Sequence, residues 1–557
     1  MRRLSDYTGD AEALDEGVEG SLSLATPVPN GRPRAARPLL RTWAASFFVI
    51  WLAAASWSWA SPVGSAPDEP AHLIRAASLV RGELLGHALP HVTASNKAYL
   101  AVEAPEVFAR LANDVQCFQS KPSVPASCQG SLAGSRADVN VYTYVGRYPP
   151  LYYALVGLPT LAMVSPGGIY LARLVSASLS AAMLALGVVC ARRCRGTPLI
   201  GAGMALAVTP MTLYLAGVIN PSGLEIASAI TAWVAGMALV SGADDGAPAP
   251  VVVGTLGLSL MVLLLVRGLS PLWVACIAAA LVAFLGRRVR VLARARIVQN
   301  WFGGCVVAGL AALAWDLYAN PFLTEPGAPV AKGTATPQLL MLALERVDRL
   351  VTSSVGQFGW LDTPSPFAVI VTWLGALGAI VLIATCVASR RDALVTAGTL
   401  ATWVVLPLIL ILAEARSEGI VGQGRDFMGL AVGAPLVASA ATGERFANRA
   451  ASLRLSTLVV IALVFCQVLD FYGALRRNTV GITGPLDAFA GTADAWHPPV
   501  PALLTFLVFA FAVASCGLLM RLVAASAPSG QKPAMGAYDV VAASAASCER
   551  EETPSLR

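Results

Sequence analysis

The stretch TWAASFFVIWLAAASWSWA, residues 42–60, is an unbroken apolar run, and PDEPAHLIR, residues 67–75, places two adjacent carboxylates shortly after it. The run approaches the roughly 20 apolar residues that cross a bilayer as a helix. It is longer than the apolar core of a signal peptide, about 7–15 residues, so we interpret it as a retained first span. Four arginines between residues 32 and 41 are expected to hold its start in the cytoplasm.

The rest of the chain has the same character. Of its 557 residues, 56% are hydrophobic and only 13% are charged, whereas a soluble domain carries about 25% charged residues. The apolar runs are continuous and lack the alternation of a barrel strand. We therefore predict an all-α polytopic membrane protein of about 12–13 spans. The expected spans are 42–60, 169–190, 198–219, 222–240, 251–266, 270–285, 298–318, 366–388, 393–414, 427–442, 455–473 and 501–523.

Basic residues set the expected orientation. Arginines gather at 192–195, 287–296, 390–391 and 445–454, and such clusters mark cytoplasmic loops. The net charge of +6 is explained in this way and does not indicate a nucleic-acid partner. All the clusters fall on one side only if the apolar segment 149–165 does not cross completely, so we predict that it is re-entrant or lies along the outer surface.

This topology divides the chain into three parts. Residues 1–38 and 524–557 are polar and small, and we expect two disordered cytoplasmic tails. Residues 39–523 form the transmembrane domain. Its enlarged first outer loop is 61–168, its second large outer loop is 319–365, and 415–426 and 474–500 are smaller outer loops.

Charged residues recur where spans reach the outer side, and ionisable groups near spans indicate function. The alternative is that charges at span ends simply reach toward water. Because both signs recur near short turns, we interpret the group as one polar site at the outer face. Its members are Asp68, Glu69, Arg147, Arg173, Glu225, Arg267, Asp316, Asp362, Glu414, Arg425, Asp426 and Asp470.

Two interpretations of Asp68-Glu69 stay open. The carboxylates can cap the amphipathic helix expected over residues 70–85, or one of them can act as a catalytic base. The spacing to His72 also permits a divalent cation, but we favour an ordinary polar histidine. No cofactor is required by the sequence.

Polar motifs with glycine or proline mark further candidates. Arg425 follows Gly422-Gln423-Gly424, and its guanidinium suits phosphate; pairing with Asp426 or Glu418 is the alternative. Asn220 can bind a ligand or cap the next helix. Trp360 in the segment 359–364 is typical of an interfacial anchor.

Cys117 and Cys128 share the polar first outer loop. An exported loop favours oxidation, so we predict a disulfide between them, with two free thiols as the alternative.

Several of these motifs occur in an order that resembles a bacterial family of multi-pass membrane proteins known only as a domain of unknown function. The resemblance covers roughly residues 40–475. The motifs are Pro-Asp-Glu-Pro-x-His (67–72), Arg-Tyr-Pro-Pro-Leu-Tyr-Tyr (147–153), Asn-Pro-Ser-Gly-Leu-Glu (220–225), Gly-Trp-Leu-Asp-Thr (359–363) and Gln-Gly-Arg (423–425). An aromatic residue usually follows Gln-Gly-Arg in that family, whereas Asp426 stands here. That family is in turn similar to the GT-C superfamily, which includes protein O-mannosyltransferases, aminoarabinose transferases and mycobacterial arabinofuranosyltransferases.

The resemblance implies a GT-C-like bundle in the cell membrane and a glycosyltransferase reaction on its outer face. The donor would be a polyprenyl-phosphate-linked sugar, and the acceptor an envelope glycan or glycolipid. A first-loop carboxylate would be the base, matching Asp68 or, as second choice, Glu69. We expect the substrate-binding residues to be His72, Arg147, Arg173, Asn220, Glu225, Asp362, Gln423 and Arg425. A lipid-linked sugar flippase or transporter is the main alternative, and an inactive scaffold a third.

Overall fold

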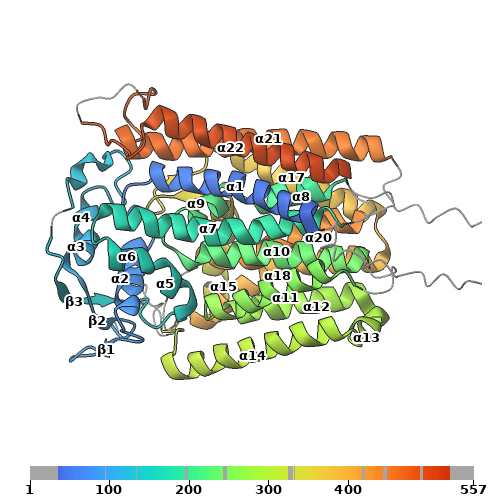
Figure 1. Ribbon diagram of the computed structural model, residues 1–557, viewed down its shortest axis with the longest axis horizontal. Coiled ribbons are helices and arrows are strands. Elements are labelled where there is room, and N and C mark those ends of the chain that lie inside the picture. The colour runs from blue at the N-terminus through green and yellow to red at the C-terminus, as the bar shows by residue number, and fades with distance from the viewer. Residues whose placement is uncertain are drawn as a thin grey trace, which may run out of the picture.

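The computed structural model shows a bundle of long helices that run along the longest axis of the molecule (Figure 1). It describes residues 36–93, 96–132, 134–194, 198–242, 248–323, 330, 333–416, 419–420, 422–442, 448–489 and 494–526. The predicted disorder of the two tails falls mostly outside these residues. Where it does not, it is wrong, because residues 36–38 belong to the first helix and residues 524–526 to the last.

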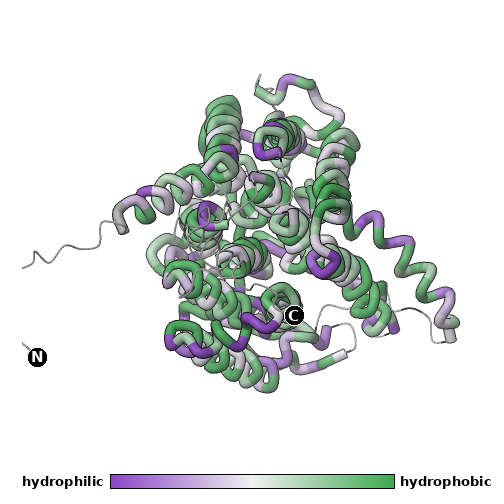
Figure 2. The backbone as a smooth tube through the Cα atoms, turned by 90° about the vertical axis from the view of Figure 1, so that its right-hand side faces the viewer, coloured by the Kyte–Doolittle hydropathy of each residue, from purple (hydrophilic) through white to green (hydrophobic). Residues whose placement is uncertain are grey.

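Nine helices of the described residues are long and apolar enough to cross a membrane, which agrees with an all-α polytopic membrane protein. They are α1 (Ala36–Ala60), α7 (Pro166–Ala191), α10 (Pro221–Ser241), α12 (Ser270–Leu285, continued by η3, Gly286–Arg288, and α13, Val289–Leu292), α14 (Arg296–Ala319), α17 (Phe367–Val387), α18 (Arg390–Glu414), α21 (Arg449–Val480) and α22 (Ala502–Ser526). Seen end-on, these helices consist largely of hydrophobic residues (Figure 2).

Two of the expected spans are not continuous helices in the described residues. The expected span 198–219 is broken into α8 (Ile200–Ala207) and α9 (Pro210–Ala216), because Pro210 has no N–H to continue the helix. The expected span 427–442 is broken into η4 (Gly424–Phe427), α19 (Met428–Ala431) and α20 (Gly433–Thr442). Helix α11 (Pro250–Val266) is continuous but has only 17 residues.

The segment 149–165 does not form a spanning helix. It folds into α5 (Pro150–Val156) and α6 (Leu158–Ala162), which pack against α2 (Glu69–Val80) and α7. This result agrees with the prediction that the segment does not cross completely. The side of the membrane on which it lies stays a prediction.

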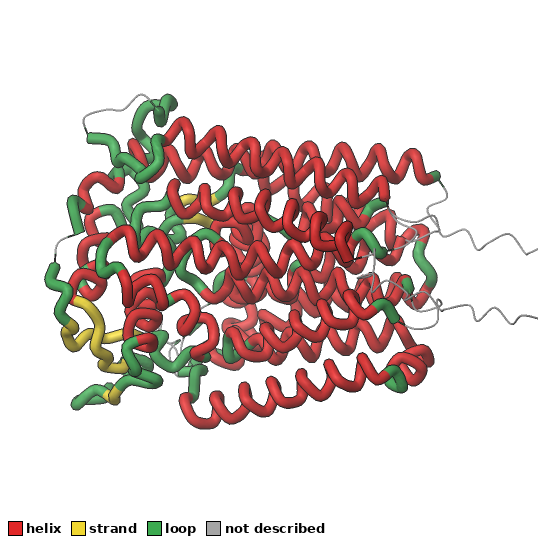
Figure 3. The backbone as a smooth tube through the Cα atoms, in the orientation of Figure 1, coloured by secondary structure: helices red, strands yellow, loops and turns green. Residues whose placement is uncertain are grey.

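The first predicted outer loop is a compact unit at one end of the bundle, where most strands and loops gather (Figure 3). Its three-stranded antiparallel sheet has the order β1 (His87–Ala88), β2 (Leu100–Pro105), β3 (Asp138–Thr143), with Ala101 opposite both His87 and Tyr142. The unit also contains α2, α3 (Glu106–Ala109), α4 (Leu111–Asp114), η1 (Val115–Cys117) and η2 (Ala126–Gln129). The second large loop adds α15 (Thr336–Leu344), α16 (Val347–Val355) and the hairpin of β4 (Gln357–Phe358) and β5 (Thr363–Pro364).

Helix α2 differs from the amphipathic surface helix expected over residues 70–85. It ends at Val80, and every residue from Glu69 to Ser78 is buried, including the polar ones. The reason is that α2 is enclosed on several sides, by α5, β2 and β3 among other elements. The helix is therefore part of the protein interior and does not rest on a membrane surface.

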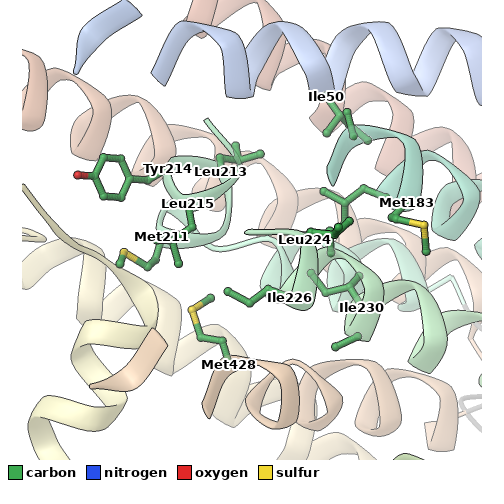
Figure 4. Close-up of a cluster of buried hydrophobic side chains, with 14 of the residues drawn as sticks. Ile50, Met183, Met211, Leu213, Tyr214, Leu215, Leu224, Ile226, Ile230 and Met428 are labelled. Atoms are coloured by element: carbon green, nitrogen blue, oxygen red, sulfur yellow. The ribbon is translucent and has the colours of Figure 1, made fainter. Parts of the chain in front are cut away.

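The core lies where α1, α7, α9, α10 and α19 meet (Figure 4). Ile50, Met183, Leu215, Ile226 and Met428 contribute to one hydrophobic cluster there. Small residues allow the helices to approach closely, as is common between membrane helices. At Gly217, for example, an added Cβ would lie 2.9 Å from Cβ of Trp57 on α1.

The described parts of the basic clusters occur together at the end of the bundle opposite the first-loop unit, where α13 is labelled (Figure 1). Arg391, in the first turn of α18, donates a hydrogen bond to the carbonyl of Ala283 near the end of α12. The clusters of 287–296 and 390–391 are therefore neighbours. The distribution is the one that the basic-residue rule requires, with the clustered arginines and the acidic pair at opposite ends.

Candidate functional site

A cavity of about 340 Å³ lies at the end of the bundle that carries the first-loop unit. Three other cavities in the described part of the chain have volumes of about 10, 40 and 70 Å³. The polar lining of the 340 Å³ cavity comes from segments far apart in the sequence: Asp68, His72, Tyr144, Tyr148, Asn220, Ser222, Arg267, Glu414, Gln423, Arg425 and Asp426. Leu269, Phe322, Leu410, Ile411 and Phe427 supply an apolar part of the wall.

Asp68 and Arg425 meet in this cavity across 357 positions of the sequence. Nη2 of Arg425 donates to Oδ2 of Asp68, and the hydroxyl of Tyr144 donates to Oδ1 at 2.6 Å. The Asp68 side chain keeps 29% of its surface exposed, whereas that of Arg425 keeps 7%. The carboxylate is thus accessible from the cavity and held by one partner on each oxygen.

The backbone at Asp68 favours this position. Asp68 precedes α2 and has a left-handed conformation with φ 63°, which aspartate tolerates better than most residues. Its side chain makes no capping hydrogen bond to α2. Pro70, in the first turn, needs no N–H partner. Of the two interpretations left open by the sequence, helix capping therefore does not account for Asp68.

The surroundings keep Asp68 ionised. Burial raises the pKa of its carboxyl group, but the charge of Arg425, the nearby His72 and the hydrogen bonds from Tyr144 and Arg425 outweigh burial, so that the pKa lies below its ordinary value of 3.8. A carboxylate with a lowered pKa accepts protons weakly. The pair with Arg425 is therefore the main obstacle to Asp68 acting as a base.

His72 lines the same cavity one turn along α2. Its Nδ1 is 2.8 Å from the hydroxyl of Tyr153. Burial, together with the charges of Arg425 and Arg267, lowers the pKa of His72 to about 3 against the opposing effect of Asp68. The imidazole is therefore neutral at pH 7 and can exchange hydrogen bonds with a ligand but carries no charge toward it.

A second arginine in the cavity wall has fixed partners. Nη1 of Arg267 donates to Oε2 of Glu225 at 2.9 Å and to Ser222 at 3.1 Å, and Nη2 donates to Asp426 at 3.3 Å. The other oxygen of Glu225 accepts from Ser270 and Trp273. Glu225 thus holds Arg267 in place from behind the wall.

The loop that presents Arg425 is packed closely against α16. The N–H of Gly424 donates to Oγ of Ser353 at 2.9 Å, and an added Cβ at Gly424 would lie 2.6 Å from the nitrogen of Ser354. The N–H of Gln423 donates to Asp426 at 3.2 Å, while its side-chain oxygen is buried without a partner. The absence of a side chain at Gly424 therefore allows this loop to approach α16 closely.

Glu69, the neighbour of Asp68, lies outside the cavity. Both of its carboxylate oxygens bind the guanidinium of Arg173, at 2.7 and 2.6 Å, and they also accept from the N–H groups of Gly64 and Ile219. Glu69 and Arg173 have 0% exposed side chains. We therefore drop the expectation of a catalytic Glu69 and of a substrate-binding Arg173, because each side chain is buried and bound to the other.

Of the other expected site residues, some line the cavity and some lie outside it. Asn220 lines the cavity and also caps α10, since its Oδ1 accepts from the N–H of Ser222 at 2.9 Å. Arg147 is outside the lining and donates to the carbonyl of Ala319 at 2.9 Å. Asp362 is likewise outside and binds Arg477 at 2.6 Å.

The structure adds residues that the sequence did not single out. Tyr144 was missed, although it lies only three residues before Arg147 in the motif that begins there. Arg477 was missed too; its guanidinium binds Asp362 and donates to the carbonyls of Phe118, Lys121 and Val124. These three carbonyls lie in the loop between Cys117 and Cys128. The predicted disulfide closes this loop, and the Cα atoms of the two cysteines are 6.1 Å apart. Trp360 is partly exposed and packs against the core; its role as an interfacial anchor stays a prediction.

Within the described residues, no group of three or more His, Cys, Asp or Glu side chains is placed to hold a metal ion.

A family model described as "Predicted membrane protein (DUF2142)" matches residues 50–434, which is more than half of the chain. No curated protein and no solved structure matches.

Proposed function

We propose a function for this chain, which belongs to the DUF2142 family of predicted membrane proteins. In this proposal the protein transfers a sugar from a polyprenyl-phosphate donor to a hydroxyl of an envelope glycan or glycolipid. The observation that carries the proposal is the cavity in which a partly exposed carboxylate, Asp68, meets a guanidinium, Arg425. These are the two charges that such a transfer requires, one for the acceptor proton and one for the departing phosphate.

The proposed step is a direct displacement at the anomeric carbon. The acceptor oxygen forms a bond to that carbon while the bond from the carbon to the phosphate oxygen breaks. Asp68 takes the acceptor proton, and the electron pair of the broken bond leaves with the polyprenyl phosphate, next to Arg425. The anomeric configuration is inverted.

The composition of the cavity wall supports a lipid-linked donor. Arg425 and Asn220 are on the polar side, whereas Phe322, Leu410 and Ile411 form an apolar part. A phosphate can therefore bind beside Arg425 while its hydrocarbon chain lies along the apolar part. The polar groups Gln423 and His72 can hydrogen-bond to sugar hydroxyls.

A flippase or transporter of lipid-linked sugars is the competing function, and it needs a polar route through the bundle. Two other cavities of the described chain lie among apolar side chains, such as Leu206 and Trp373 in one and Leu184 and Val460 in the other. This arrangement favours an enzyme with chemistry at one end of the bundle.

The test is a transferase assay on membranes with defined polyprenyl-phosphoryl sugars. Asp68→Asn is expected to lower kcat about 10²–10⁴-fold, the usual contribution of a general base. Asp138→Asn is the matched control, since Asp138 also pairs with an arginine, Arg81, but lies outside the cavity. Full activity of Asp68→Asn would exclude the proposed role.

A further inference from the structure

We infer that Asp68 occupies Arg425 in the absence of donor, that the donor phosphate displaces it, and that Tyr144 then keeps the released carboxylate in position. This inference rests on the proposed function and describes how its site is regulated. The base would be inactive until the donor is bound.

The two oxygens of the Asp68 carboxylate have different partners. Oδ2 of Asp68 binds Arg425 and Oδ1 binds the hydroxyl of Tyr144. Loss of one partner therefore leaves the other in place. Tyr144 follows β3 and belongs to the first-loop unit, like Asp68, whereas Arg425 belongs to η4 in a distant part of the chain. The two partners can separate without disturbing the unit that carries Asp68.

The two arginines in the cavity wall differ in their hydrogen-bond partners. Arg267 is shared by Glu225, Ser222 and Asp426. Arg425 donates to Asp68 and, at 3.5 Å, to the carbonyl of Pro67. Among the described residues, the carboxylate that Arg425 contacts directly is that of Asp68, the proposed base; Glu418, the other carboxylate expected beside it, lies outside the described residues. Arg425 is therefore the arginine whose partner can be exchanged.

The exchange is favourable because Arg425 is never left unpaired. Removing a buried guanidinium from its anionic partner is costly, but a phosphodiester supplies another anion with matching geometry. Asp68 then loses a positive neighbour, and its proton affinity increases. Because His72 is neutral, with its pKa lowered to about 3 by burial and by Arg425 and Arg267, it does not replace the lost charge.

Other charged groups around Asp68 do not reverse this result. Tyr148, which lines the cavity, has its pKa raised by burial and stays neutral at pH 7. Asp426 is held by Arg267 and by the N–H of Gln423. The consequence is ordered binding: the donor binds first, and only then can Asp68 accept a proton from the acceptor.

A binding experiment separates this inference from the proposed function. The probe is farnesyl methyl phosphate, a diester with a single charge over the pH range used, titrated into the purified full-length protein in detergent. Asp68→Asn is expected to lower Kd about tenfold, because Arg425 is released, and Arg425→Gln to raise Kd by at least about tenfold. Asn tolerates the left-handed backbone of position 68. Asp138→Asn should leave Kd unchanged.

Control ligands identify the group that is recognised. Farnesol, without phosphate, should bind wild type and Asp68→Asn equally; a similar gain for farnesol would overturn the exchange. A gain for inorganic phosphate as well would support exchange at Arg425 and show that free phosphate can also occupy it. An unchanged or raised Kd for the diester in a folded Asp68→Asn protein would overturn the inference. Absent transferase activity would refute the proposed function alone.

Tyr144 is tested by the pH dependence of the same Kd. Protonation of Asp68 releases Arg425, so wild-type affinity should increase as the pH falls toward the carboxyl pKa, and Asp68→Asn should lack this change. Tyr144→Phe removes a hydrogen bond that lowers the pKa of Asp68, so the increase should begin at higher pH. A purely structural Tyr144 would weaken binding at every pH without moving the transition, and that result would overturn its positioning role.

Discussion

Glu69 binds Arg173 in an ion pair with no exposed surface on either side chain, and Oε2 of Glu69 lies 2.6 Å from Nη2 of Arg173. The same guanidinium donates to the carbonyls of Ser58, Ser61 and Pro62. The pair therefore joins the end of α1, the start of α2 and the first turns of α7. Its position fixes the backbone of Asp68, the adjacent residue, beside the cavity.

We predict that Glu69→Gln destabilises the protein strongly. The substitution leaves the Arg173 charge without a buried partner, and breaking such a pair costs about 3–5 kcal/mol. Thermal unfolding in detergent should show a clearly lowered midpoint for Glu69→Gln and a smaller decrease for Asp68→Asn, because the Asp68 side chain keeps 29% of its surface exposed whereas Glu69 keeps none. Equal midpoints for Glu69→Gln and wild type would mean that Glu69 is not structural.

Gly424→Ala is expected to weaken binding of the phosphodiester probe. The new methyl group would lie within 2.6 Å of Oγ of Ser353 and of the nitrogen of Ser354, so η4 must shift and carry Arg425 with it. Overpacking of this kind costs about 1–3 kcal/mol, and we expect Kd to rise about tenfold.

Gly375→Ala in α17 is the matched control for that change. An added Cβ at Gly375 meets nothing within 4 Å, and alanine is the better helix former by up to about 1 kcal/mol. The control should therefore leave Kd unchanged. If both substitutions raised Kd alike, the effect at Gly424 would not come from its contact with α16.

Apolar length predicted most of the bundle, because each span must satisfy its own backbone in lipid whatever its neighbours are. Apolar length failed where a break depends on one residue: Pro210 interrupts a run that is apolar on both sides of it. Proline was visible in the sequence and gave a signal for this break. The burial of α2 had no such signal, because the elements that cover it come from later in the chain.

The site was predicted in part for a comparable reason. Position in the first outer loop indicated both Asp68, the preferred base, and Glu69, the second choice, since both are carboxylates before Pro70. Their partners, Arg425 and Arg173, are 357 and 104 positions away, and local sequence does not contain such pairings. Without them, the accessible carboxylate cannot be distinguished from the buried one.

Asp362→Asn should loosen the disulfide-closed loop. Asp362 neutralises Arg477, which in turn donates to three carbonyls of the segment 118–124. With the carboxylate removed, Arg477 is a nearly buried charge without an anion, and we expect these contacts to open. Hydrogen exchange should increase in peptides spanning 115–130 and stay unchanged in peptides spanning 422–427. Increased exchange in both regions would contradict a local role.

The pH dependence of transfer should differ between the free enzyme and the enzyme with bound donor. Asp68 must be deprotonated to accept the acceptor proton, so activity is lost as the pH falls through its pKa. In the free enzyme Arg425 helps to keep this pKa below 3.8, so the acid limb of kcat/KM for the donor should lie below pH 3.8. With donor saturating, Arg425 binds phosphate instead, the pKa of Asp68 rises, and the acid limb of kcat should move to higher pH.

Tyr144→Phe should shift both limbs upward, because Tyr144 stabilises the carboxylate in both states. Coincident limbs of kcat and kcat/KM in wild type would show that the donor does not separate Asp68 from Arg425.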